Sequence, residues 1–396
     1  MKRIGNSFKG IIGGLIFILF GIGFLWWNEG NNVKNLKTTA QMSKTYIDVS
    51  SDKVDSKNEG KLVATNGKLT NEKELADTKF NIVIKTPKLE RIVEIYQWKE
   101  ESETDEDGGT RYSYSKVWSS EIIDSADFHN NGHENPKTKE YDDETFISDE
   151  VKVGAFELSS EQIHMLSTNA SFSDFDEEYV KNMSLTISGK YITNSVDMNK
   201  PQIGDMRISF VYNNSTDVSI LAVQKGNSFT DFVSSEGKNI NRIMDGVHNG
   251  ESMINTIKKE NNFFKWLFRF IGIFSCIVGF ATILKPLSAI TSYIPIVGNI
   301  VDAAVWLVAT ILGLCLGLVI IAIAWIRFRP ILGIAILLVV GVLLFLLINK
   351  NKKNKVNKVE PQPIGEIIEK KSNVEEATSE VEESTEAEVT EEDVSE

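Results

Sequence analysis

The chain has 396 residues and a formal net charge of −13, with 42% hydrophobic and 24% charged residues that are concentrated in separate segments. Its only cysteines, Cys276 and Cys315, lie in long apolar segments, which excludes a disulfide framework from the polar part of the chain. The usual nucleotide-binding, serine-hydrolase and zinc-protease motifs are absent from the sequence, so no recognised catalytic centre is predicted.

Two apolar blocks, residues 11–27 and 263–348, frame a mostly polar middle segment. Because about 20 apolar residues cross a bilayer as a helix, the blocks predict an integral membrane protein. The first block lacks a small-residue cleavage site and is read as a retained signal anchor. Prolines and charges divide the second block, with residues 285–299 forming an interfacial or re-entrant connection. The four predicted spans cover residues 11–27, 263–284, 300–326 and 331–348.

Four spans put both ends of the chain on one side of the membrane. Lysine and arginine residues cluster in residues 1–10 and again after residue 349, so both ends are expected to be cytoplasmic and residues 28–262 to face the far side. Arg327 and Arg329 oppose this orientation, but arginines beside a proline turn can snorkel to headgroups. Residues 349–396 begin basic, become Glu-rich and are predicted to be disordered.

Between residues 28 and 262 apolar residues recur mostly at every second position, a spacing typical of β-strands. We predict a β-rich (α+β) extramembrane domain. Turn-forming residues at 103–109 and 213–216 predict two hairpins, one joining strand 92–98 to strand 112–118 and one joining strand 208–212 to strand 218–223. Helices are predicted after Ser159, where Gln162 completes a capping-box spacing, and from Glu251 into the second span.

Aromatic residues on the first hairpin are candidates for binding a partner or a lipid headgroup, and cross-strand packing is the favoured alternative. The loop around His133 and Asn135 is a second candidate, which a tight turn explains equally well. Arg329, at the edge of a predicted span, completes the candidate set. The set is Tyr96, Trp98, Tyr112, Tyr114, Trp118, His133, Asn135 and Arg329.

The spacing of Gly313 and Gly317 permits close helix approach and favours self-association. A rival hypothesis is a membrane enzyme that uses Lys285, Asp302 or Arg329 at the bilayer edge, although an acidic residue at a helix start more often serves as a cap.

Several short motifs in the order found here resemble the transmembrane protein 43 family, also called LUMA, over about residues 10–349. They are Trp27–Gly30, Asn58–Val63, Glu94–Trp98, Arg111–Tyr114, Gly132–Pro136, Gly204–Phe210 and Phe328–Pro330. The resemblance implies a non-enzymatic protein that, in animals, resides in the endoplasmic reticulum and inner nuclear membrane, self-associates and helps organise the nuclear envelope with lamins and emerin. It transfers no catalytic, cofactor-binding or metal-binding residues.

The sequence therefore predicts a self-associating membrane scaffold without a cofactor. Its expected partners are the lipid bilayer, further copies of itself and other membrane or envelope proteins, of the lamin and emerin type only in a eukaryote, and no nucleic acid. The alternative is a lipid-binding or stress-response protein in the cytoplasmic membrane of a bacterium.

Overall fold

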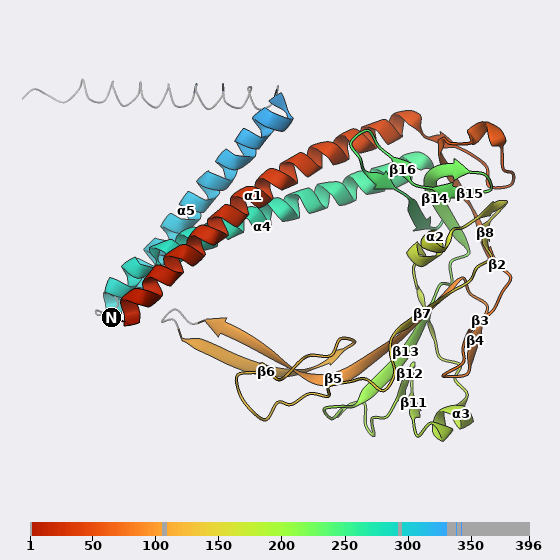
Figure 1. Cartoon of the computed structure of the whole chain (residues 1–396), viewed down its shortest axis with the longest axis horizontal. Helices are drawn as coiled ribbons and strands as arrows, with labels where there is room; N and C mark the ends of the chain where they lie inside the picture. The colour runs from red at the N-terminus through yellow and green to blue at the C-terminus, as the bar shows by residue number, and fades with distance from the viewer. Residues whose placement is uncertain (1, 105–108, 292–294, 331–337, 339–341, 343–396) are drawn as a thin grey trace, which may run out of the picture. The chain divides into compact units, whose positions relative to one another are not determined.

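The computed structural model describes residues 2–104, 109–291, 295–330, 338 and 342 (Figure 1). The chain divides into two compact units, residues 1–321 and residues 322–396. The predicted fourth span at 331–348 falls almost entirely outside the described residues, and the acidic tail falls wholly outside them.

Within the described residues, three helices are long and apolar enough to cross a membrane: α1 (Lys2–Thr45), α4 (Gly250–Thr291) and α5 (Pro295–Phe328). Helix α1 continues well past the predicted end of the first span, and α4 runs unbroken from the predicted helix start at Glu251 into the second span. Outside the predicted spans these two helices lie side by side as far as the β-rich region (Figure 1).

Helix also occupies most of the predicted connection at 285–299, because α4 passes through Pro286 and α5 begins at Pro295. A proline costs a helix one hydrogen bond, but membrane-spanning helices tolerate this loss when neighbouring groups compensate. Asp302 consequently lies about two turns inside α5, so the expectation that it caps the helix is wrong.

The first sheet has the strand order β15-β14-β2-β8-β9, with β1 paired to β2 and β18 paired to β14. Strand β14 lies in its centre, between the antiparallel strand β2 on one side and β15 and β18 on the other. The strands are β1 (Ile47–Asp48), β2 (Leu62–Asn71), β8 (Val151–Val153), β9 (Phe156–Glu157), β14 (Asp217–Lys225), β15 (Ser228–Thr230) and β18 (Arg242–Asp245).

The second sheet has the strand order β11-β12-β13-β5-β6, with β10 paired to β13 and β7 paired to β5. Its strands are β5 (Lys88–Thr104), β6 (Thr110–Ser119), β7 (Glu144–Ile147), β10 (Ala170–Phe172), β11 (Thr186–Ser188), β12 (Tyr191–Thr193) and β13 (Met206–Tyr212). Two small ribbons pair β3 (Leu75–Asp77) with β4 (Ile82–Ile84) and β16 (Phe232–Val233) with β17 (Asn239–Ile240). Short helices complete the region: η1 (Ser56–Asn58), α2 (Ser160–Met165) and α3 (Glu177–Asn182).

The first predicted hairpin is confirmed, with β5 and β6 paired from Ile95 opposite Ser119 to Thr104 opposite Thr110. The second is wrong, because β13 and β14 lie in different sheets. Both faces of β14 are buried: Val218 and Ile220 pack in one apolar cluster and Leu221 in another. A strand that is buried on both faces lies in the interior of a sheet, and β14 does so between β2 and β18. The predicted capping box at Ser159 and Gln162 is confirmed.

The extramembrane ends of α1 and α4 are part of the core of the first sheet. Met42 of α1 and Met253, Ile254 and Ile257 of α4 form one buried cluster with strand residues that include Leu221. Burial of apolar side chains is the main favourable term in folding, so this cluster fixes both helices to the sheet.

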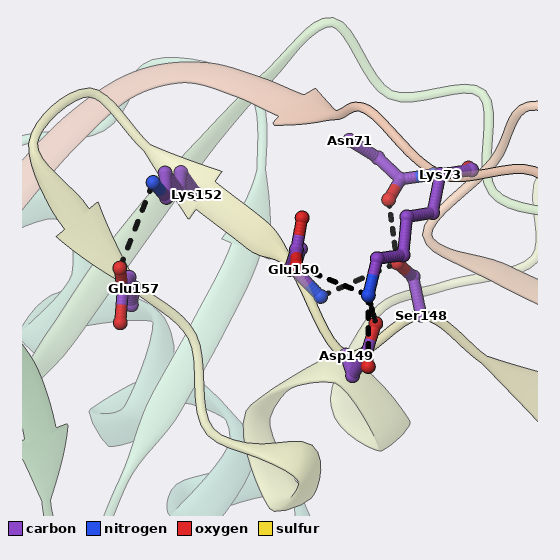
Figure 2. A network of polar contacts seen from close by, with 7 residues as sticks. All are labelled: Asn71, Lys73, Ser148, Asp149, Glu150, Lys152 and Glu157. Atoms are coloured by element: carbon purple, nitrogen blue, oxygen red, sulfur yellow. Dashed lines mark hydrogen bonds and ion pairs between the residues drawn. The ribbon is translucent and has the colours of Figure 1, made fainter.

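A surface polar network links the ends of β2 and β8, as Figure 2 shows. Lys73 Nζ lies 2.8 Å from Asp149 Oδ1 and 3.0 Å from Glu150 Oε1, and Ser148 Oγ donates to Asn71. The hydrogen bond from Lys73 lowers the pKa of the Asp149 carboxyl. Because the charged side chains are exposed, we assign the network little stability.

Candidate functional site

The predicted aromatic residues lie on one face of the β5–β6 hairpin. Residues directly opposite each other in an antiparallel pair share a face, and Tyr96 lies opposite Trp118 with ring centroids 5.2 Å apart. Trp98, Tyr112 and Tyr114 follow at every second position on the two strands. All five side chains are only partly buried.

The loop of residues 120–136 packs over this face. The His133 ring stacks on Tyr114 at 3.7 Å between centroids and meets Trp98 edge-on at 4.6 Å, and the His129 ring stacks on Tyr112 at 4.0 Å. The structure therefore brings together the candidates of the first unit, whereas Arg329 belongs to the second unit.

Asn135 attaches the loop to β5. Its side-chain oxygen accepts from Trp98 N at 2.7 Å, and its Nδ2 donates to Trp98 O at 2.8 Å and to Ile123 O at 3.1 Å. The amide thus satisfies both backbone groups of Trp98 in the way that a neighbouring strand would.

Charged groups surround the same rings. Glu100 accepts from the Tyr114 hydroxyl and from the His129 N–H, and the hydrogen bond from Tyr114 is the main reason that the Glu100 pKa is lowered. Lys116 Nζ lies 4.7 Å from the Trp98 ring centroid, and the Arg207 guanidinium lies 4.5 Å from that of Trp118. These contacts pair the rings with groups of the same chain, and recognition of a lipid headgroup or partner by the rings stays a prediction.

A buried charge cluster in the second sheet was missed by sequence reasoning. Arg91 bonds the carboxylates of Asp77 and Glu144 and donates from Nε to the Asp142 carbonyl at 2.9 Å, with its guanidinium 5.4 Å from the Phe80 ring centroid. Arg91 shares the inward face of β5 with Leu89, Val93 and Ile95. The sequence signal that could have revealed this cluster was an arginine within a row of inward-facing apolar residues. We assign the cluster a structural role in the core of the domain.

Helices α1 and α4 approach closely inside the predicted spans. A Cβ added to Gly21 would lie 2.6 Å from Cys276 Sγ and 2.8 Å from the carbonyl oxygen of Gly272, and one added to Gly279 would lie 2.7 Å from that of Gly14. The glycines are seven residues apart on each helix, Gly14 with Gly21 and Gly272 with Gly279. Small residues at such spacing let two membrane helices come into backbone contact.

A buried ion pair joins the same helices where the first predicted span ends. Arg269 Nε lies 2.6 Å from Glu29 Oε1, and their side chains are 9% and 1% exposed. Next to it, Asn28 Nδ2 donates to the Lys265 carbonyl at 3.1 Å, and the Arg269 guanidinium lies 4.8 Å from the Trp266 ring centroid. An arginine inside the apolar run 263–284 was the sequence signal for this pair.

Gly313 and Gly317 make a close helix contact within the chain, and self-association through them stays a prediction. Gly313 and Gly317 of α5 face α4, where added Cβ atoms would lie 2.5 Å from Ile277 Cγ1 and 2.7 Å from Ile273 Cγ1. Arg329 follows the end of α5 in the second unit, where its N–H donates to the Trp325 carbonyl and its guanidinium lies 5.9 Å from the Trp325 ring centroid.

No group of three or more His, Cys, Asp or Glu residues in the described part of the chain is arranged to hold a metal ion. No solved structure matches the chain. The model of the family described as Transmembrane protein 43 matches residues 95–330, which is more than half of the chain.

Curated relatives named Transmembrane protein 43 align over most of the chain. The human protein is 27% identical over 357 residues, covering 85% of this chain and 88% of its own length, and the mouse protein is 27% identical over 351 residues, covering 83% and 87%. A Drosophila melanogaster protein named Transmembrane protein 43 homolog is 25% identical over 345 residues, covering 82% and 90%. The match to the family model over more than half of the chain leads to one conclusion: this chain belongs to the Transmembrane protein 43 family.

Proposed function

We propose that this protein is a non-enzymatic membrane organiser, a scaffold that self-associates and binds partner proteins through its extramembrane domain. The observation that carries the proposal is the continuity of α1 and α4, which run without a break from the predicted spans into the core of the first sheet. A binding domain on such a rigid support keeps a fixed position over the bilayer, whereas a flexible linker would let it move. The non-enzymatic names of the relatives agree with this role.

The outer edge of β6 is the surface that we propose for self-association. Among the described strands β6 pairs with β5 alone, and its ten residues contain no proline. A long edge strand is a template for pairing with another chain, and two copies of β6 can pair antiparallel around a two-fold axis.

The membrane that we propose is the endoplasmic reticulum or inner nuclear membrane in a eukaryote and the cytoplasmic membrane in a bacterium.

Cysteine crosslinking in native membranes tests this interface. The exposed native Cys315 would be replaced by alanine, and Ser115 in the middle of β6, which is exposed, by cysteine. Because a disulfide requires Cα atoms within about 7 Å, we expect a crosslinked dimer from Ser115→Cys under mild oxidation.

Ser56→Cys, exposed on η1, is the matched control and should remain monomeric. Equal crosslinking at both positions would contradict the β6 interface. A monomer by mass measurement in lipid nanodiscs would overturn self-association itself.

A further inference from the structure

Three asparagines in the chain are followed directly by glycine, a pair of residues that can undergo deamidation. When the backbone nitrogen of the glycine reaches the side-chain carbonyl carbon of the asparagine, a five-membered succinimide ring forms and ammonia leaves. Glycine favours this step because it has no Cβ to restrict the backbone or to shield the nitrogen. The pairs are Asn66 with Gly67, Asn131 with Gly132, and Asn249 with Gly250.

Asn66 is held in the first sheet. Its Nδ2 donates to the His248 carbonyl at 3.2 Å. Gly67 lies within β2, opposite Val218 of β14. A strand inside a sheet cannot turn to close the ring without loss of its pairing to the neighbouring strand, so this pair can react only after local opening.

Asn249 is held at the start of α4. Its side-chain oxygen accepts from Ser252 N at 2.8 Å, as an N-cap residue does, and Gly250 N donates to Asp48 Oδ1 at 2.8 Å. Gly250 is buried, and a Cβ added to it would lie 2.4 Å from a carbon of the Tyr46 ring. Both reacting groups of this pair are therefore engaged.

Asn131 differs from the other two asparagines because it lies at an exposed bend in the loop of residues 120–136. No residue in the described part of the chain forms a hydrogen bond with its side chain. Gly132 has a φ of +91°, and a Cβ added there would meet nothing within 4 Å. Gly132 N donates to Glu134 Oε1 at 3.0 Å, but this bond lies within the exposed loop, so its opening disrupts no sheet or helix.

We propose that Asn131 is a deamidation site whose products weaken the attachment of this loop to the β5–β6 hairpin. Gly132 N loses its proton and bonds to Asn131 Cγ, while the Cγ–Nδ2 bond breaks and the amide leaves as ammonia. Water then adds to either carbonyl carbon of the ring and opens it, which gives aspartate or isoaspartate without a change of oxidation state. Water is the co-reactant, and the site is independent of the scaffold function proposed above.

The pair lies between two contacts that attach the loop to the hairpin. Before it in sequence, the His129 ring stacks on Tyr112 and His129 N donates to Glu100. After it, the His133 ring stacks on Tyr114. Isoaspartate adds one carbon to the main chain between these contacts, and either product adds a negative charge close in sequence to the bond with Glu100. The stacked rings therefore lose the chain length that fits their present spacing.

Peptide mass spectrometry of the full chain in detergent, incubated in mildly alkaline buffer, tests the site. We expect the peptide with Asn131 to gain about one dalton roughly tenfold faster than those with Asn66 and Asn249, which react only from locally opened molecules. In denaturant the three pairs should convert at similar rates, because the fold no longer holds two of them. Equal rates in the folded chain, or a difference that persists in denaturant, would overturn the assignment.

Asn131→Gln is the matched control for the effect on the loop, because glutamine keeps an uncharged amide but would need a less favourable six-membered ring. Hydrogen exchange in residues 120–136 should accelerate severalfold in the incubated parent and stay constant in incubated Asn131→Gln. Freshly prepared Asn131→Asp has the charge without the longer main chain, so it should accelerate exchange less than isoaspartate does. Unchanged exchange in a fully converted parent would overturn the effect on the loop.

Discussion

The α1–α4 helix pair and the β5–β6 hairpin are both long antiparallel pairs, but they use polar side chains in opposite ways. The helix pair buries one ion pair, Glu29 with Arg269, beside close glycine contacts. The hairpin distributes its polar contacts over half-exposed residues such as Asn135, Tyr114 and Glu100. A single substitution in the ion pair should therefore strongly lower the stability of the helix pair. A single substitution in the hairpin should only partly weaken the attachment of its loop.

The largest effect is expected from Arg269→Met. This change leaves the Glu29 carboxylate buried without its arginine, and breaking a buried ion pair in this way costs about 3–5 kcal/mol. We expect a correspondingly lower midpoint of thermal unfolding for the full chain in detergent, measured by tryptophan fluorescence.

The double variant Glu29→Leu with Arg269→Met is the control for the helix pair. Replacing both partners with apolar residues removes the charges together, and such replacements are often neutral or stabilising. The double variant should therefore be more stable than Arg269→Met alone. If both unfold at the same temperature, the pair does not hold α1 against α4.

Local patterns predicted local structure well. The β5–β6 hairpin followed from alternation of apolar residues on either side of a turn-forming segment, and α2 followed from the pairing of Ser159 with Gln162. In both cases the interacting residues are near each other in sequence, so the pattern contains both partners.

Long-range pairing could not be predicted in the same way. Strand β14 pairs with β2, for example Leu221 with Ala64, and no local signal indicates a partner so distant. The same limit hid the Glu29–Arg269 contact, because each charge could be seen in the sequence but the packing of α1 on α4 could not. The polar segment of α1 after Trp27 has no strong helix pattern and depends on α4 for its packing.

A smaller effect is expected at the hairpin from Asn135→Ala. The change removes three hydrogen bonds. Because the partly buried backbone groups of Trp98 can form hydrogen bonds with water instead, we expect the attachment of the loop to be weakened by only about 1–2 kcal/mol. Hydrogen exchange at Trp98 and in residues 120–136 should accelerate, while the unfolding midpoint of the whole chain changes little.

Asn130→Ala is the control in the same loop. Asn130 takes part through its backbone, accepting from His133 and donating to the Tyr114 hydroxyl, and alanine keeps both groups. Exchange in this variant should match the parent. Equal acceleration in both variants would mean that the loop opens for a reason other than loss of the Asn135 amide.

The smallest effect is a pH dependence of the loop, which arises from Glu100. Its pKa is lowered in the folded chain, chiefly by the hydrogen bond from Tyr114, relative to about 4.3 for a free glutamate. A carboxyl group with a lowered folded pKa contributes stability above its unfolded pKa and loses that contribution as the pH falls through the folded pKa. Tryptophan fluorescence and the protection factor of the His129 amide, which corrects for the intrinsic pH dependence of exchange, should therefore be constant near neutral pH and report loop opening only below about pH 4. Glu100→Gln should flatten this transition. Glu134 also has a lowered pKa, because its carboxylate accepts a hydrogen bond from the N–H of Gly132. The variant Glu134→Gln therefore measures the part of the pH dependence that Glu100 does not cause. A transition unchanged in Glu100→Gln would show that the Tyr114–Glu100 contact does not hold the loop on the hairpin.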